Sequence, residues 1–189
     1  MNALVKSENK YSANLTAGQL VADTKQYLTF TLGGEMFSIN ILCIKEIIWY
    51  ASLTEVPMMP ACIRGVINLR GAVVPVMDLS ARFGKPSTAV TKSSCIVIIE
   101  IETNTEGERQ NMGVVVDAVQ AVLEIPASEI EPAPTFGSKI RSDFIEGIGK
   151  VNGKFVILLN VNRVLSTREI GAMGQAAASA NLALAHEGS

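Results

Sequence analysis

An internal repeat is the feature that most constrains the fold of this sequence. Residues 145–165 match residues 63–83 at a constant offset of 82, with glycines and aliphatic residues at the same places. Residues 114–122 match residues 39–47 in the same way, at an offset of 75. Two unrelated β segments can look alike because Val, Ile and Gly are common in them, but glycines at identical spacing favour a true repeat. The sequence therefore predicts two copies of one small unit, about 26–86 and about 93–165.

Each unit is predicted to consist of short β-strands. Alternating apolar residues over 27–32 and 36–41 flank Gly33-Gly34, which is typical of a β-hairpin. Further strands are predicted at 65–68, 72–77, 94–100, 112–116, 145–151 and 155–159. A unit of this size is near the lower limit for a self-sufficient core. We therefore expect a mainly β fold in which two small barrels pack against each other.

The strand-rich region covers residues 23–165. The two segments that flank it are predicted to lack its β-strand pattern. Residues 1–22 lack apolar periodicity, so a flexible leader is expected there. Ser166 and Glu169 have the spacing of a capping box, which predicts a C-terminal helix and tail over 166–189. Gly171 and Gly174 are expected to weaken that helix.

Composition and motifs argue against several classes of function. The single histidine is His186, and no nucleophile-elbow, zinc-protease or phosphate-loop motif occurs. With 16 Lys and Arg against 18 Asp and Glu, and 5% aromatic residues, the chain lacks the basic stacking surface of a nucleic-acid binder. Cys43, Cys62 and Cys95 lie far apart in apolar runs, so we expect reduced thiols and no metal site. No catalytic residue or cofactor is predicted, and without a signal peptide or apolar span the expected location is the cytoplasm.

The run Ile63–Leu79, IRGVINLRGAVVPVMDL, resembles the signature of the CheW family, the coupling proteins of bacterial chemotaxis. Similar motifs occur at 30–33, 37–41, 44–47, 114–119 and 131–134, so the resemblance covers about residues 26–166. It implies two five-stranded SH3-like barrels around a shared apolar core, with no catalysis. It also implies two partners, the cytoplasmic tip of methyl-accepting chemotaxis receptors and the regulatory domain of the histidine kinase CheA. Such an adaptor would reach the membrane only indirectly, in receptor arrays.

The resemblance assigns receptor contacts to Ile44, Glu46, Gly65 and Arg70. In the repeat, Arg70-Gly71 takes the place of Asn152-Gly153, a pair typical of a tight turn with left-handed backbone. Arginine tolerates that backbone less well than asparagine, at a cost of up to about 1 kcal/mol. This favours a binding role for Arg70, whose planar guanidinium suits carboxylates and carbonyls. The alternatives are an ordinary solvated arginine and, for Glu46, a plain surface carboxylate.

The resemblance assigns kinase contacts to Leu28, Ile39, Leu42 and Phe136. The period of two places Ile39 on a face expected to be barrel core, and core is an equal alternative for Leu28. Leu42 falls on the opposite face, where it must pack on the other barrel or meet a partner. Glu131 stands where a basic residue can precede the Pro-Ala-Pro run, which departs from the family pattern near Phe136.

Other functions remain as alternatives at this point. A CheW-like scaffold for a non-chemotactic CheA-type kinase has the same sequence features. A β-barrel that binds a small molecule is a second alternative, although its inward positions are aliphatic. A nucleic-acid-binding barrel is disfavoured by the formal charge of −2.

Overall fold

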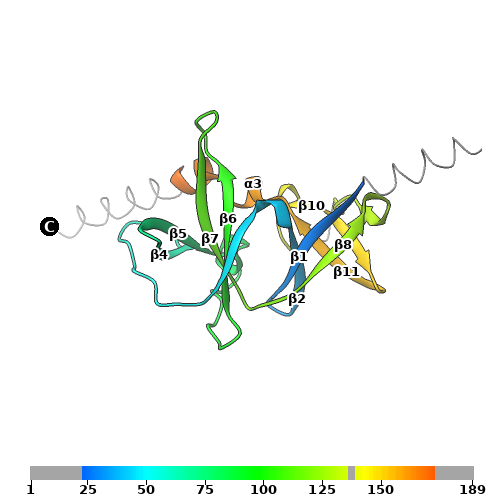
Figure 1. The fold of residues 1–189 in the computed structure, drawn as a ribbon, viewed down its shortest axis with the longest axis horizontal. Helices are drawn as coiled ribbons and strands as arrows, with labels where there is room; N and C mark the ends of the chain where they lie inside the picture. Colours follow the sequence, from blue (N-terminus) through cyan, green and yellow to red (C-terminus); the bar gives the residue numbers. More distant parts are fainter. Residues whose placement is uncertain (1–22, 136–138, 173–189) are drawn as a thin grey trace, which may run out of the picture.

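The computed structural model describes residues 23–135 and 139–172, which form two β-sheets joined by short helical turns (Figure 1). The mainly β class expected from the sequence is confirmed. The predicted leader over 1–22, residues 173–189 of the predicted tail, and Phe136 lie outside the described residues.

The first sheet has the strand order β8-β1-β2-β11-β10-β9, and the second has the order β3-β6-β7-β5-β4. The first consists of β1 (Thr24–Leu32), β2 (Glu35–Asn40), β8 (Ala118–Pro126), β9 (Ile130–Glu131), β10 (Ile145–Val151) and β11 (Lys154–Leu159). The second consists of β3 (Ile44–Trp49), β4 (Ile63–Leu69), β5 (Ala72–Asp78), β6 (Cys95–Glu102) and β7 (Arg109–Val116). The helical turns are η1 (Ile41–Cys43), α2 (Leu79–Arg82), η2 (Ala127–Glu129), η3 (Ser142–Phe144) and α3 (Val161–Val164), and residues 167–172 are also helical.

The two sheets exchange their hairpins between the two copies of the repeat. The β1–β2 hairpin of the first copy pairs with β8 and β11 of the second, and the β6–β7 hairpin of the second pairs with β3 and β5 of the first. The parallel pairs that join them are equivalent, Leu158 opposite Ser38 and Val76 opposite Gly113. This corrects the expectation of one barrel over 26–86 and another over 93–165. A sequence repeat identifies equivalent segments, but it does not say whether a hairpin pairs within its own copy.

The repeat itself is reproduced residue by residue in the β4–β5 and β10–β11 hairpins. Both have a register shift before the matched glycine, Gly65 or Gly147, and both end in a four-residue helix, α2 or α3. A side chain caps each helix: Asp78 accepts a hydrogen bond from Ala81, and Asn160 accepts one from Arg163. The offset of 82 therefore marks a true structural repeat.

The largest apolar cluster lies between the two sheets. It takes Leu28, Phe30 and Phe37 from the first sheet and residues such as Val97 and Val114 from the second. Two smaller clusters fill the other side of each sheet, one around Tyr27, Ile125 and Leu158 and one around Ile67, Val76 and Ile96. Because both sheets contribute to the largest cluster, neither sheet has a complete apolar core without the other.

Asp78 is fully buried and bonds to several segments of the first copy. Its Oδ2 lies 3.0 Å from Arg64 Nε and accepts a hydrogen bond from the Thr88 N–H at 2.9 Å. Its Oδ1 accepts from the Ala81 N–H and from the Thr88 hydroxyl. Arg64 also donates to the Thr88 carbonyl and lies near the Tyr50 ring. A buried carboxylate with this many partners holds the connection that leaves α2 against β4.

Candidate partner-binding surface

Two of the predicted receptor residues, Glu46 and Arg70, are in contact. Arg70 Nη1 lies 2.9 Å from Glu46 Oε2. Glu46 comes from β3 and Arg70 from the tip of the β4–β5 hairpin, so the pair joins the two edge strands of the second sheet. The Arg70 side chain is 80% exposed, whereas that of Glu46 is 23% exposed. The guanidinium is therefore oriented by a carboxylate beside it while most of its surface faces solvent.

The backbone at Arg70 has the left-handed conformation that the repeat predicts. Its φ is 51°, the same as that of Asn152, and the following glycines have φ of 86° and 76°. Asn68 Oδ1 accepts a hydrogen bond from the Gly71 N–H at 2.8 Å and steadies the turn. A non-glycine residue with positive φ is strained, and arginine has no short polar group to relieve it. The turn at 70–71 therefore holds an exposed cation at the expense of stability.

Exchanging the residues at these two matched turns tests that strain. We expect Arg70→Asn to raise the free energy of unfolding by about 0.5 kcal/mol, because relief of strain exceeds the loss of an exposed ion pair. We expect the reciprocal change Asn152→Arg to lower it by about 1 kcal/mol. Urea unfolding of both variants measures the difference, and equal losses in both would contradict the strain argument.

Ile44 and Gly65, the other predicted receptor residues, are tied to the interior. Ile44 is half-buried and packs against the shared core. A Cβ placed on Gly65 would lie 2.4 Å from the Thr54 carbonyl oxygen, a distance that no side chain tolerates. Thr54 and Val66 exchange backbone hydrogen bonds at this point, so Gly65 lets the loop pair with β4. Its structural role is thus apparent without a partner.

The four predicted kinase residues separate into different environments. Leu28 and Ile39 are 3% and 2% exposed, and they face each other across β1 and β2 in the shared core. Both therefore take the core position that was the alternative to a kinase contact, because the inter-sheet face of this hairpin is covered by the other sheet. Leu42, in η1, is 89% exposed. Phe136 lies outside the described residues.

The predicted site residues do not include those of an exposed apolar face of β3. Ile47 and Trp49 point to the same side of β3, and Trp49 is 70% exposed. Their strand partners, Val97 and Cys95, belong to the shared core, so this face continues the core surface out to the sheet edge. The signal was present in the sequence, because residues 44–49 are apolar on both faces of one strand apart from Lys45 and Glu46.

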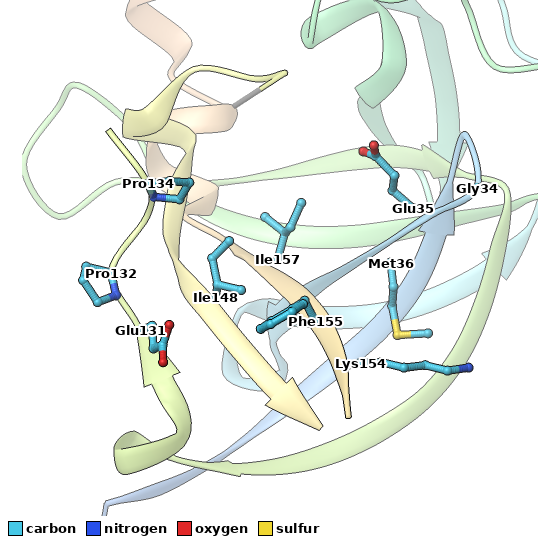
Figure 2. A pocket seen from close by; sticks show the side chains of 10 residues that line it. All are labelled: Gly34, Glu35, Met36, Glu131, Pro132, Pro134, Ile148, Lys154, Phe155 and Ile157. Carbon is cyan, nitrogen blue, oxygen red and sulfur yellow. The ribbon is translucent and has the colours of Figure 1, made fainter. Parts of the chain in front are cut away.

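A second apolar surface is a groove on the first sheet, with a volume of about 760 Å³ (Figure 2). Phe155, Ile148 and Ile157 form its floor from β10 and β11, and Phe155 is 65% exposed. Pro132 and Pro134 form one wall, and Figure 2 shows them facing the isoleucines. Phe155 is not among the predicted site residues, although its place after the Asn-Gly turn indicates an exposed position.

Comparison with known proteins identifies the family to which this arrangement of two sheets belongs. Residues 26–169 match the model of the CheW-like domain. The chain belongs to the CheW family. It is 32% identical over 166 residues to the chemotaxis protein CheW of Klebsiella aerogenes, covering 87% of this chain and 96% of that protein. It is 33% identical over 144 residues to the chemotaxis protein CheW of Bacillus subtilis, covering 75% and 86%.

A solved CheW structure shares the fold. The scaffolding protein TtCheW of Thermoanaerobacter tengcongensis superposes with a TM-score of 0.67 and 36% sequence identity, covering 76% of this chain and 88% of its own. The resemblance noted in the sequence is thereby confirmed, and the chain is a CheW-like chemotaxis scaffold protein. In the part of the chain that the structure describes, no helix is long and apolar enough to cross a membrane.

Proposed function

We propose that this CheW-family chain is a non-enzymatic adaptor that links the cytoplasmic tips of chemoreceptors to a CheA-type histidine kinase at receptor arrays. The observation that carries the proposal is Arg70. Its strained backbone costs stability, its guanidinium is exposed, and a single carboxylate orients it. A side chain held in this way is suited to bidentate contact with a carboxylate or carbonyl on a helical receptor tip.

The receptor contact centres on Arg70 and extends along β3. Glu46 orients the guanidinium, Ile44 supports the strand from the core side, and Gly65 keeps the adjacent loop in place. The exposed Trp49 lies on the opposite face of the same strand, so it is not part of this contact. Receptor binding would therefore depend on one oriented cation at the sheet edge.

The kinase contact involves the first sheet. Leu42 is an exposed leucine in a short turn, where an apolar pocket on the kinase regulatory domain can enclose it. Phe136 is a second anchor in the proposal, and it follows the Pro132–Pro134 wall of the groove. Leu28 and Ile39 act indirectly, by packing beneath the hairpin that leads to Leu42.

Reversing the charge at position 70 tests the receptor contact. We expect Arg70→Glu to weaken binding of a soluble receptor-tip fragment by tenfold or more, about 1.4 kcal/mol, because a carboxylate then takes the place of the cation that faces carboxylates or carbonyls of the receptor. Thermal unfolding should change little, since the side chain is exposed. Isothermal titration calorimetry with the fragment measures the affinity.

The matched control is Arg109→Glu, which reverses an exposed arginine of the same sheet that pairs with Glu100. It should keep its receptor affinity, and both variants should keep their affinity for the regulatory domain of the kinase. Wild-type receptor affinity in Arg70→Glu would refute the assignment. Co-purification of a kinase from a non-chemotactic pathway would favour the alternative scaffold.

A further inference from the structure

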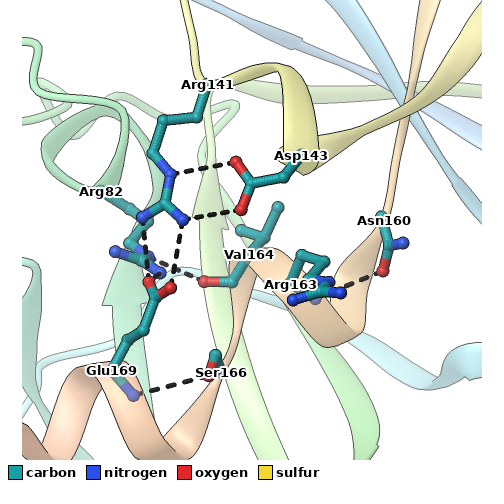
Figure 3. Close-up of polar contacts among 8 residues, drawn as sticks. All are labelled: Arg82, Arg141, Asp143, Asn160, Arg163, Val164, Ser166 and Glu169. Atoms are coloured by element: carbon teal, nitrogen blue, oxygen red, sulfur yellow. Dashed lines mark hydrogen bonds and ion pairs between the residues drawn. The ribbon is translucent and has the colours of Figure 1, made fainter.

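A cluster of charged side chains lies where the last helix of the described chain meets the rest of the fold (Figure 3). Glu169, in the first turn of the helix over 167–172, accepts hydrogen bonds from Arg82 and from Arg141. The distances are 2.6 Å from Arg82 Nη2 to Glu169 Oε2, and 3.0 and 3.1 Å from the two Arg141 nitrogens. One carboxylate therefore joins α2 of the first copy to the segment that precedes η3 in the second.

The two arginines are held in place independently of Glu169. Arg82 Nε donates to the Val164 carbonyl at 2.8 Å, and its side chain is 2% exposed. Arg141 pairs with Asp143 through two hydrogen bonds, and both guanidinium groups lie over the Phe144 ring, at 4.7 and 4.4 Å from its centroid. The two cations are thus arranged to receive a carboxylate whichever group supplies it.

The helix has few other attachments in the described residues. Ser166 caps it by accepting a hydrogen bond from the Glu169 N–H, and the Ile170 N–H donates to the Ser166 carbonyl. Both bonds lie within the helix itself. The half-buried Ile170 packs on the shared core. The predicted capping box forms on its serine side only, because the Glu169 side chain turns away from Ser166 toward the arginines (Figure 3).

We propose that Arg82 and Arg141 form a carboxylate-binding clamp, which the chain fills with its own Glu169 to hold the last helix as a strap across the two copies. A carboxylate from a partner's acidic side chain is the class of ligand that can take the place of Glu169. Displacement frees the helix and uncovers the end of the shared core beside Ile170.

The electrostatics agree with a carboxylate held in a clamp. Hydrogen bonds from Arg141 first, and from Arg82 second, lower the pKa of Glu169 to about 2. Hydrogen bonds to Asp143 and Glu169 raise the pKa of Arg141 above its ordinary value. Arg141 and Glu169 are therefore both fully charged at neutral pH.

Emptying the clamp and offering acetate tests the proposal on the full chain. We expect Glu169→Ala to lower Tm by about 5 °C and to speed amide exchange at Ile170 by about tenfold, because charge-assisted hydrogen bonds are lost. Sodium acetate should restore part of the lost Tm, and sodium chloride at equal ionic strength should not. Wild type should respond equally to the two salts, because its clamp is occupied.

Arg168→Ala is the matched control, since Arg168 is exposed in the same helical turn. It should behave as wild type in both salts and in exchange. Equal responses of Glu169→Ala to acetate and chloride, or unchanged exchange at Ile170, would overturn the proposal. If Glu169→Ala does not fold, Glu169→Gln keeps one acceptor oxygen, and the same comparison of salts decides the matter.

Discussion

Replacing Gly65 by alanine is expected to lower the free energy of unfolding by about 3 kcal/mol, a typical upper value for overpacking. The added methyl group would lie 2.4 Å from the Thr54 carbonyl oxygen and 3.0 Å from its carbon. Both atoms are backbone, so no side-chain rotation relieves the clash. The loop must move away from β4, and the two hydrogen bonds between Thr54 and Val66 are then lost.

Urea unfolding measures this effect, with Gly171→Ala as the control. Gly171 lies in the helix over 167–172, where an added Cβ meets nothing within 4 Å, so alanine should be neutral or stabilising there. The Gly65 variant is also expected to lose receptor affinity, because the displaced loop pairs with β4, the strand that leads to Arg70. Normal stability combined with lost receptor binding would show instead that Gly65 touches the receptor itself.

The second large effect is expected at Asp78. Asp78→Ala should lower the free energy of unfolding by about 4 kcal/mol, because it leaves the partly buried Arg64 guanidinium without its carboxylate. It also removes the cap of α2 and both bonds to Thr88. Thermal and urea unfolding of the variant measure the loss.

The repeat provides the control for this prediction. Asn160 occupies the equivalent position and caps α3 through the Arg163 N–H. Asn160→Ala should therefore cost only the cap, about 1 kcal/mol. Comparable losses in the two variants would mean that capping, and not the buried ion pair, accounts for the effect at Asp78.

The sequence predicted the local structure of this chain better than its pairing. Gly-Gly and Asn-Gly turns, the period of two and the offset of 82 depend on neighbouring residues, so the hairpins and the strain at Arg70 follow from them. The hairpin exchange depends on which apolar faces meet across a large sequence separation. Equivalent hairpins have similar faces, so a sequence repeat does not distinguish pairing within a copy from pairing between copies.

The same limit applies to the candidate site. Residue type and spacing, together with the family resemblance, singled out Arg70 as a candidate, because its turn contradicts its own folding preference. For Leu28, which the second sheet covers, they left core and kinase contact as equal alternatives, and for Leu42, which is exposed on a turn, they left packing on the other barrel and partner contact open. Alternation indicates that two faces of a strand differ, but which face is covered depends on the packing of the whole molecule.

The repeat has a further consequence when both copies are held in one polypeptide. A dimer of two identical chains that exchanged hairpins in this way would carry every substitution twice, once on each side of its symmetry axis. A single polypeptide can carry a substitution in one copy and leave the equivalent position of the other copy without strain. Here the turn of the first copy has Arg70 in a strained left-handed backbone, while the equivalent turn of the second copy has Asn152. Covalent linkage thus lets an almost symmetrical body present different surfaces to different neighbours.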